Sequence, residues 1–149
     1  MTQKLTILIM MMLLAAALVT SGFVFQTNSY ARFTQQDSSE ALDSSSRISM
    51  SVENDSLTDS GLTLLITNQT AEEMTYGMDY LVEQKRDGNW YAIDEEQIVN
   101  DIAVLLPPGK TQDFAVTWEK PLPKGEYRII KPIWDGEQTI RYAINFNVL

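Results

Sequence analysis

A regular alternation of large apolar residues with small or polar ones constrains this chain most. Ile140, Tyr142, Ile144, Phe146 and Val148 follow this pattern, with a smaller or polar residue between each pair. Side chains two residues apart lie on the same face of a β-strand, so this period of two predicts a strand with one buried face. Shorter runs of the same kind cover residues 48–52, 62–67 and 114–118. The pattern therefore predicts an all-β fold.

Turn residues separate these runs at short intervals. Asp87-Gly88 and Asp135-Gly136 supply the positive φ angles that a tight hairpin needs. We therefore expect residues 80–85 to pair with 89–93, and residues 127–133 to pair with 139–148. Seven short strands separated by turns predict a sandwich of two sheets.

The N-terminus has the pattern of a targeting segment. Lys4 precedes the run Leu5–Phe25, which contains no charged residue, so we expect an apolar helix there. Small residues at Ser29 and Ala31 suit cleavage after Ala31, whereas the length of the run also suits a retained membrane anchor. Both alternatives place the rest of the chain outside the cytoplasm, secreted or tethered to the membrane, because Lys4 should stay inside.

The chain thus divides into three parts. Residues 1–31 are predicted to be a signal peptide or membrane anchor. Residues 32–46 contain many serines and few large apolar residues, which predicts a flexible spacer. Residues 47–149 are predicted to form the folded β-sandwich domain.

Composition excludes several classes of function. The net charge is −9, and Lys4 is the one charged residue among the first 31, so the rest is more acidic still. Such a charge repels phosphate backbones, so we expect no nucleic-acid partner, and membrane contact only through residues 5–25 if they are retained. The chain has no cysteine and no histidine, which removes disulfides, Ser-His and Cys-His nucleophiles, and histidine metal ligands.

Carboxylates are the remaining candidates for chemistry. Asp94, Glu95, Glu96 and Asp101 fall in one predicted loop. Calcium accepts such oxygens, and paired carboxylates serve glycosidases, but these residues and Asp55–Asp59 lack the spacing of a calcium loop. We expect no enzymatic activity, no cofactor and no metal site. A carboxylate enzyme or a calcium-dependent carbohydrate binder is the least favoured alternative.

Residues 122–127 carry a short motif that resembles a structural signature. Leu122, Pro123, Gly125 and Tyr127 resemble, at closer spacing, the Leu-x-Pro-x-x-x-Tyr signature that precedes the sixth strand of fibronectin type III domains. That resemblance implies a structural corner in which the tyrosine hydroxyl bonds back to the backbone.

A longer pattern over residues 62–133 resembles the bacterial Ig-like domain family of secreted and membrane proteins. The residues that carry the resemblance are Asn68/Thr70, Tyr76/Gly77, Gly88/Trp90, Pro108/Gly109, Trp118 and Gly125/Tyr127/Arg128. It implies an Ig-like or fibronectin type III-like seven-stranded β-sandwich that binds a protein or cell-envelope partner. The same skeleton is similar to the bacterial intracellular proteinase inhibitors, which implies the alternative of an inhibitor acting through an exposed loop at residues 100–110.

A partner-binding face is predicted from exposed acids and tyrosines. Tyrosine is favoured at interfaces, although core positions for Tyr76 and Tyr91 are equally consistent with the sequence. The predicted face contains Tyr76, Asp79, Tyr91, Asp94, Glu95, Glu96 and Asp101. The acidic charge predicts a basic partner, which contacts loops or an exposed sheet edge.

Overall fold

A computed structural model describes residues 30–35, 41–95 and 102–149 of the chain. The predicted N-terminal apolar helix lies outside these residues. The described residues form ten strands: β1 (Phe33–Gln35), β2 (Ile48–Val52), β3 (Gly61–Asn68), β4 (Met74–Tyr76), β5 (Leu81–Arg86), β6 (Asn89–Ile93), β7 (Val104–Leu106), β8 (Thr111–Thr117), β9 (Gly125–Trp134) and β10 (Thr139–Val148).

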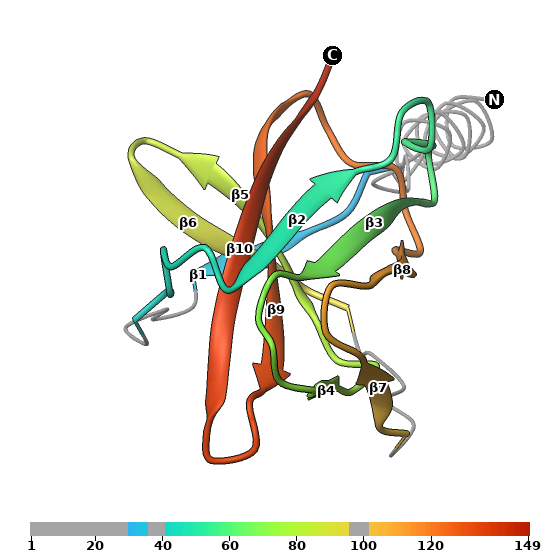
Figure 1. Cartoon of the computed structure of the whole chain (residues 1–149). Helices are drawn as coiled ribbons and strands as arrows, with labels where there is room; N and C mark the ends of the chain where they lie inside the picture. The colour runs from blue at the N-terminus through green and yellow to red at the C-terminus, as the bar shows by residue number, and fades with distance from the viewer. Residues whose placement is uncertain (1–29, 36–40, 96–101) are drawn as a thin grey trace, which may run out of the picture.

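The strands form two sheets. The larger has the order β1-β6-β5-β9-β4-β7, with β10 paired to β9, and the smaller has the order β2-β3-β8. In Figure 1 the strands of the smaller sheet run across the long hairpin of β9 and β10. Every pairing is antiparallel, and β8 ends the smaller sheet as an edge strand.

Two hairpins expected from the Asp-Gly turns are confirmed. β5 pairs with β6, and β9 pairs with β10 along its whole length. At the first turn both Asp87 and Gly88 have positive φ, 49° and 81°, as a two-residue turn of primed type requires. At the second turn the Asp135 carboxylate accepts hydrogen bonds from the backbone N–H groups of Glu137 and Gln138.

The core fills the space between the sheets with the alternating residues of their facing strands. The smaller sheet contributes apolar side chains from β2, β3 and β8, and the larger sheet contributes them from β9 and β10. Fully or almost fully buried examples are Leu62, Leu64, Ile66, Phe114, Val116, Tyr127, Ile129, Ile133 and Tyr142. The predicted period of two matches the buried faces of β3, β8 and β10, whereas β9 buries five consecutive residues, 127–131.

The strand count differs from the prediction of seven. β1, β4 and β7 contain three residues each, which is too short for an alternating pattern to stand out in the sequence. β7 lies inside the loop 100–110 proposed for protease inhibition, where it pairs with β4 and buries Leu106 completely.

β1 also corrects the prediction that residues 32–46 are entirely a flexible spacer. Phe33 and its neighbours pair with β6, and the Phe33 ring lies 5.9 Å from that of Tyr127. The N–H of the buried Ala31 donates to the carbonyl of Pro121. Backbone pairing with β6 and the packing of Phe33 thus place residues 31–35 in the fold, and the many serines in this part of the sequence hide that signal.

Candidate functional site

The outer edge of β8 is one of the open strand edges in the described part of the molecule. The N–H of Trp118 donates to Ser60, and that of Asn68 donates to Lys110, at the two ends of the β3–β8 ladder. Hydrogen-bonded pairs alternate along an antiparallel ladder, so the even-numbered residues of β8 face β3. The backbone groups of Thr111, Asp113, Ala115 and Thr117 therefore point away from the sheet.

A side chain caps this edge at one end. There the Tyr80 hydroxyl accepts from the Thr117 N–H at 2.9 Å and donates to the Thr117 carbonyl at 2.7 Å. Toward the other end the Gln112 side-chain amide donates to the carbonyl of Leu105 in β7 at 2.9 Å, which links β8 to β7. Between them, no backbone partner on the outer edge is found for Asp113 or Ala115 among the described residues.

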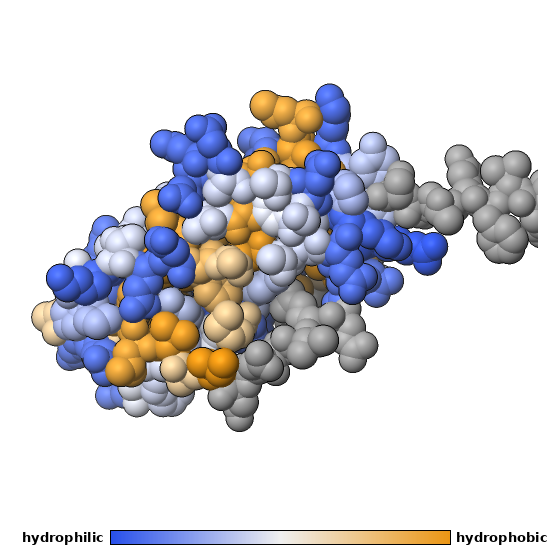
Figure 2. All heavy atoms as spheres, turned by 90° about the vertical axis from the view of Figure 1, so that its right-hand side faces the viewer, coloured by the Kyte–Doolittle hydropathy of each residue, from blue (hydrophilic) through white to orange (hydrophobic). Residues whose placement is uncertain are grey.

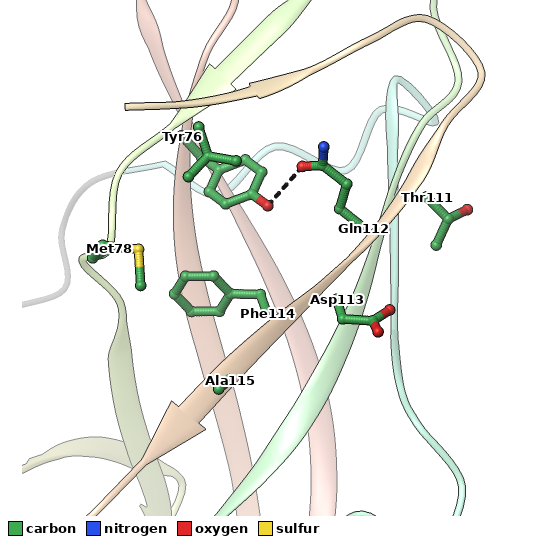
Figure 3. A pocket seen from close by; sticks show the side chains of 8 residues that line it. Tyr76, Met78, Thr111, Gln112, Asp113, Phe114 and Ala115 are labelled. Carbon is green, nitrogen blue, oxygen red and sulfur yellow. Dashed lines mark hydrogen bonds between the residues drawn. The ribbon is translucent and has the colours of Figure 1, made fainter. Parts of the chain in front are cut away.

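A groove of about 460 Å³ runs beside this open stretch. Figure 3 shows Phe114 pointing from β8 toward Met78, and Asp113 pointing to the other side of the strand. The Tyr76 hydroxyl donates to the Gln112 side-chain carbonyl at 2.9 Å, and its ring meets that of Phe114 edge to face. The groove thus has an aromatic floor and, along β8, a polar backbone wall.

A buried cation supports this floor. Lys131 of β9 is completely buried, and its Nζ donates to the carbonyls of Gly77 and Asp79 at 2.6 Å each. Nζ also lies 4.1 Å from the centre of the Phe114 ring. Burial lowers the pKa of Lys131 to about 8, which the Asp79 carboxylate partly opposes. Lys131 ties the turn that carries Met78 to the ring on the groove floor.

Electrostatics place a carboxylate near the same floor. Burial raises the pKa of the Tyr76 phenol, and the negative charge of Asp113 raises it further. Asp113 is exposed, as expected for a side chain on the outward face of β8. The groove therefore joins an apolar interior to an acidic rim.

Apolar side chains are exposed in the groove at Met78, on β7 at Leu105, and in a second hollow that also contains Tyr76, at Ile102 and Trp134. Met78, Ile102, Leu105 and Trp134 each expose more than a third of their surface. Figure 2 looks onto the side where β7 and β8 lie, and it shows apolar residues gathered between polar ones. Exposed apolar residues next to an open strand edge are typical of a protein-binding surface.

The predicted partner face is only partly assembled. Tyr76 lines the groove, but its ring is buried and only 4% exposed. Asp79 lies in the turn before β5, where its carbonyl binds Lys131. Tyr91 lies on β6, and β5 and β9 separate it from Tyr76 on β4, so the two tyrosines do not form one patch.

The acidic loop is described only in part. Asp94 is exposed, while Glu95 is half-buried and accepts a hydrogen bond from the backbone N–H of Glu119 at 2.9 Å. Glu96 and Asp101 lie outside the described residues. Within the described ranges, no group of three acidic residues is placed to hold a metal ion.

The corner residues lie at the opposite end of β9 from the groove. Tyr127 is fully buried, and its hydroxyl donates to the carbonyl of Pro123. Leu122 is buried, and Gly125 has a φ of 157° beside the amide of Gln84. A hydroxyl bonded to the backbone four residues upstream is the geometry of a tyrosine corner.

A buried ion pair is the other polar feature of the larger sheet. Glu83 is completely buried and pairs with Arg128, whose guanidinium lies 4.3 Å from the Trp90 ring. A carboxylate that is paired and closed to solvent offers no access to a substrate. We therefore assign it to the structure of the sheet.

Sequence reasoning missed most of the groove. Lys131 could have been noticed, because Tyr127, Ile129, Lys131 and Ile133 occupy the inward positions of one strand. A lysine at an inward position signals a buried cation that needs partners. Met78 and Gln112 carry no such signal, since the groove depends on how the two sheets meet.

The chain is similar in sequence to one known family. The bacterial Ig-like domain family matches residues 44–147, which is most of the chain. The resemblance noted above is thereby confirmed, whereas the proteinase inhibitor resemblance gains no support. A search of curated proteins finds no match. Among the described residues there is no helix that is long and apolar enough to cross a membrane.

Proposed function

Because the chain belongs to the bacterial Ig-like domain family, we propose that it is a non-enzymatic, extracytoplasmic module that binds a protein or cell-envelope partner. Members of this family are commonly parts of extracytoplasmic proteins, and the uncharged run Leu5–Phe25 supports the same location. The absence of histidine and cysteine from the sequence supports binding rather than catalysis.

The open edge of β8 is the observation that carries the binding site. Asp113 and Ala115 present N–H and C=O groups beside a groove of about 460 Å³. An extended segment of a partner satisfies such groups by adding a strand, and its side chains enter the groove. The partner is thus bound by backbone hydrogen bonds along β8 and by contacts with Phe114 and Met78.

Site-specific photo-crosslinking in intact cells tests this site. A photoreactive amino acid at position 115 should capture a partner, because Ala115 faces the groove entrance. The same amino acid at Ser51, exposed on β2, is the matched control. Equal capture from both positions, or none from position 115, would contradict the assignment of the site.

The location has its own test. The chain has no cysteine, so Ser51→Cys introduces a single thiol. We expect a membrane-impermeant maleimide to label it in intact cells. Labelling only after lysis would place the domain inside the cytoplasm and remove the extracytoplasmic part of the proposal.

A further inference from the structure

We propose that the groove beside β8 selects a short extended segment in which apolar side chains alternate with basic ones. This proposal rests on strand addition at β8, as proposed above, and adds the chemistry of the bound segment. Three features of the groove support it: the capped end of the edge at Thr117, the aromatic floor over Lys131, and the carboxylate of Asp113.

The capped end limits where the added strand starts. Tyr80 occupies both outward backbone groups of Thr117. The outward backbone groups on the other side of this cap belong to Ala115, Asp113 and Thr111. Residues 111–115 therefore pair with about five residues of a partner strand.

The floor selects the inward side chains. Residues of an added strand that lie beside Phe114 point toward Tyr76 and Met78, because neighbouring strands share their pleat. The cation of Lys131 lies beneath the Phe114 ring and already has two carbonyl partners. A second cation in the floor would meet a like charge, so inward positions favour apolar side chains over basic ones.

The rim selects the outward side chains. Asp113 is exposed on the outward face of β8, between Thr111 and Ala115. Opposite charges side by side on neighbouring strands attract, so a basic residue next to Asp113 is favoured. Lys110 precedes β8, beyond the Gln112 end of the open stretch.

A second copy of the chain is a poorer occupant. Pairing of two β8 edges would bring two Asp113 carboxylates together, and each chain carries a net charge of −9. Like charges on neighbouring strands are destabilising. The charge of the molecule therefore favours a basic segment from another protein.

Synthetic peptides of seven residues, capped at both ends, test the proposal with the full-length chain. The first peptide alternates valine with lysine. The second replaces each lysine by glutamate, the third replaces each valine by serine, and the fourth carries N-methyl groups on one edge. Binding is measured by isothermal titration and by the NMR shifts of the Asp113 and Ala115 amides.

We expect the valine–lysine peptide to shift both amides and to bind about fivefold more tightly than the glutamate peptide. Asp113→Lys should reverse that preference, and Asp113→Asn should reduce it. Glu137→Lys, at an exposed hairpin residue, changes the net charge by the same amount as Asp113→Lys and should leave the preference for the lysine peptide unchanged. The serine and N-methyl peptides should bind weakly.

Two failures are distinguishable. If no peptide shifts the Asp113 and Ala115 amides, strand addition at β8 is wrong, and the proposed site falls with it. If lysine and glutamate peptides shift these amides with equal affinity, strand addition stands and the basic preference is overturned. Concentration-dependent dimerisation that blocks the peptides would identify a second copy as the occupant and also overturn it.

Discussion

Two buried tyrosines at opposite ends of the fold have different partners for their hydroxyl groups. Tyr127 donates to a backbone carbonyl, that of Pro123, and stacks on Phe146. Tyr76 donates to a side chain, that of Gln112, and meets Phe114 edge to face. The first bond fixes the path of the chain into β9, whereas the second fixes only a side chain beside the groove.

The sheet edges near the two tyrosines differ in the same way. Near Tyr127, β1 adds a strand to β6 and places Phe33 against the Tyr127 ring. Near Tyr76, Tyr80 caps the β8 edge at Thr117, and the edge stays open at Asp113 and Ala115. At the corner, Phe33 of β1 packs against the buried tyrosine, whereas beside Tyr76 part of the β8 edge is left without a neighbouring strand.

The largest effect is expected at the corner. Tyr127→Ala should lower the free energy of unfolding by about 3–5 kcal/mol, because it removes a fully buried ring. Tyr127→Phe should cost about 0.5–1.5 kcal/mol, the value of one hydrogen bond. Urea unfolding of the full chain measures both. A wild-type midpoint for the alanine variant would contradict the role of the corner.

Lys131, which lies beneath the groove, should make the free energy of unfolding depend on pH. Its pKa is about 8 in the folded protein and near 10.5 when unfolded, so the unfolded chain holds more protons between these values. The free energy of unfolding should therefore rise from pH 8 to pH 10, by on the order of 2 kcal/mol. Above pH 10 it should fall, because burial keeps Tyr127 protonated in the folded protein while unfolded tyrosines ionise.

Lys131→Met tests this origin, because it keeps the length of the side chain and removes the charge. The variant should lose the rise between pH 8 and pH 10, while Lys124→Met, at an exposed position, should retain it. A rise of equal size in all three proteins would assign it to other groups.

Tyr76→Phe should lower the free energy of unfolding less than Tyr127→Phe does. The Gln112 amide that loses its partner is half-buried, so water can replace the hydroxyl, and we expect a cost below about 1 kcal/mol. Urea unfolding of the two phenylalanine variants side by side gives the ranking. A larger loss for Tyr76→Phe would mean that the region beside the groove stabilises the fold as strongly as the corner.

The smallest effect is expected outside both regions. Asp94→Asn alters an exposed side chain after β6 and should change the free energy of unfolding by less than about 0.5 kcal/mol. It should also leave crosslinking from position 115 unchanged. Loss of that crosslinking would extend the partner surface to the acidic loop.

The sequence predicted the long strands because their burial leaves a period of two in the residues. β10 shows this period at Tyr142 and Phe146. The Asp87-Gly88 pair carries a different local signal, that of the tight turn between β5 and β6. β1, β4 and β7 left no such signal, because three residues are too few for a period. Their pairing depends on strands that are distant in the sequence.

The groove could not be predicted for the same reason. Its floor joins Tyr76, Phe114 and Lys131 from three strands, and its opening depends on which edge of β8 lacks a neighbour. The predicted partner face used exposure and charge, which are local properties. It therefore included Tyr76 and omitted the backbone groups of Asp113 and Ala115.

Amide hydrogen exchange along β8 tests the open edge most directly. In the free chain the amides of Phe114 and Val116 face β3 and should exchange slowly, whereas those of Asp113 and Ala115 should exchange rapidly. Addition of the valine–lysine peptide should slow the exchange of Asp113 and Ala115. Slow exchange of all four amides in the free chain, or no slowing with any peptide, would contradict the account of β8 as a binding edge.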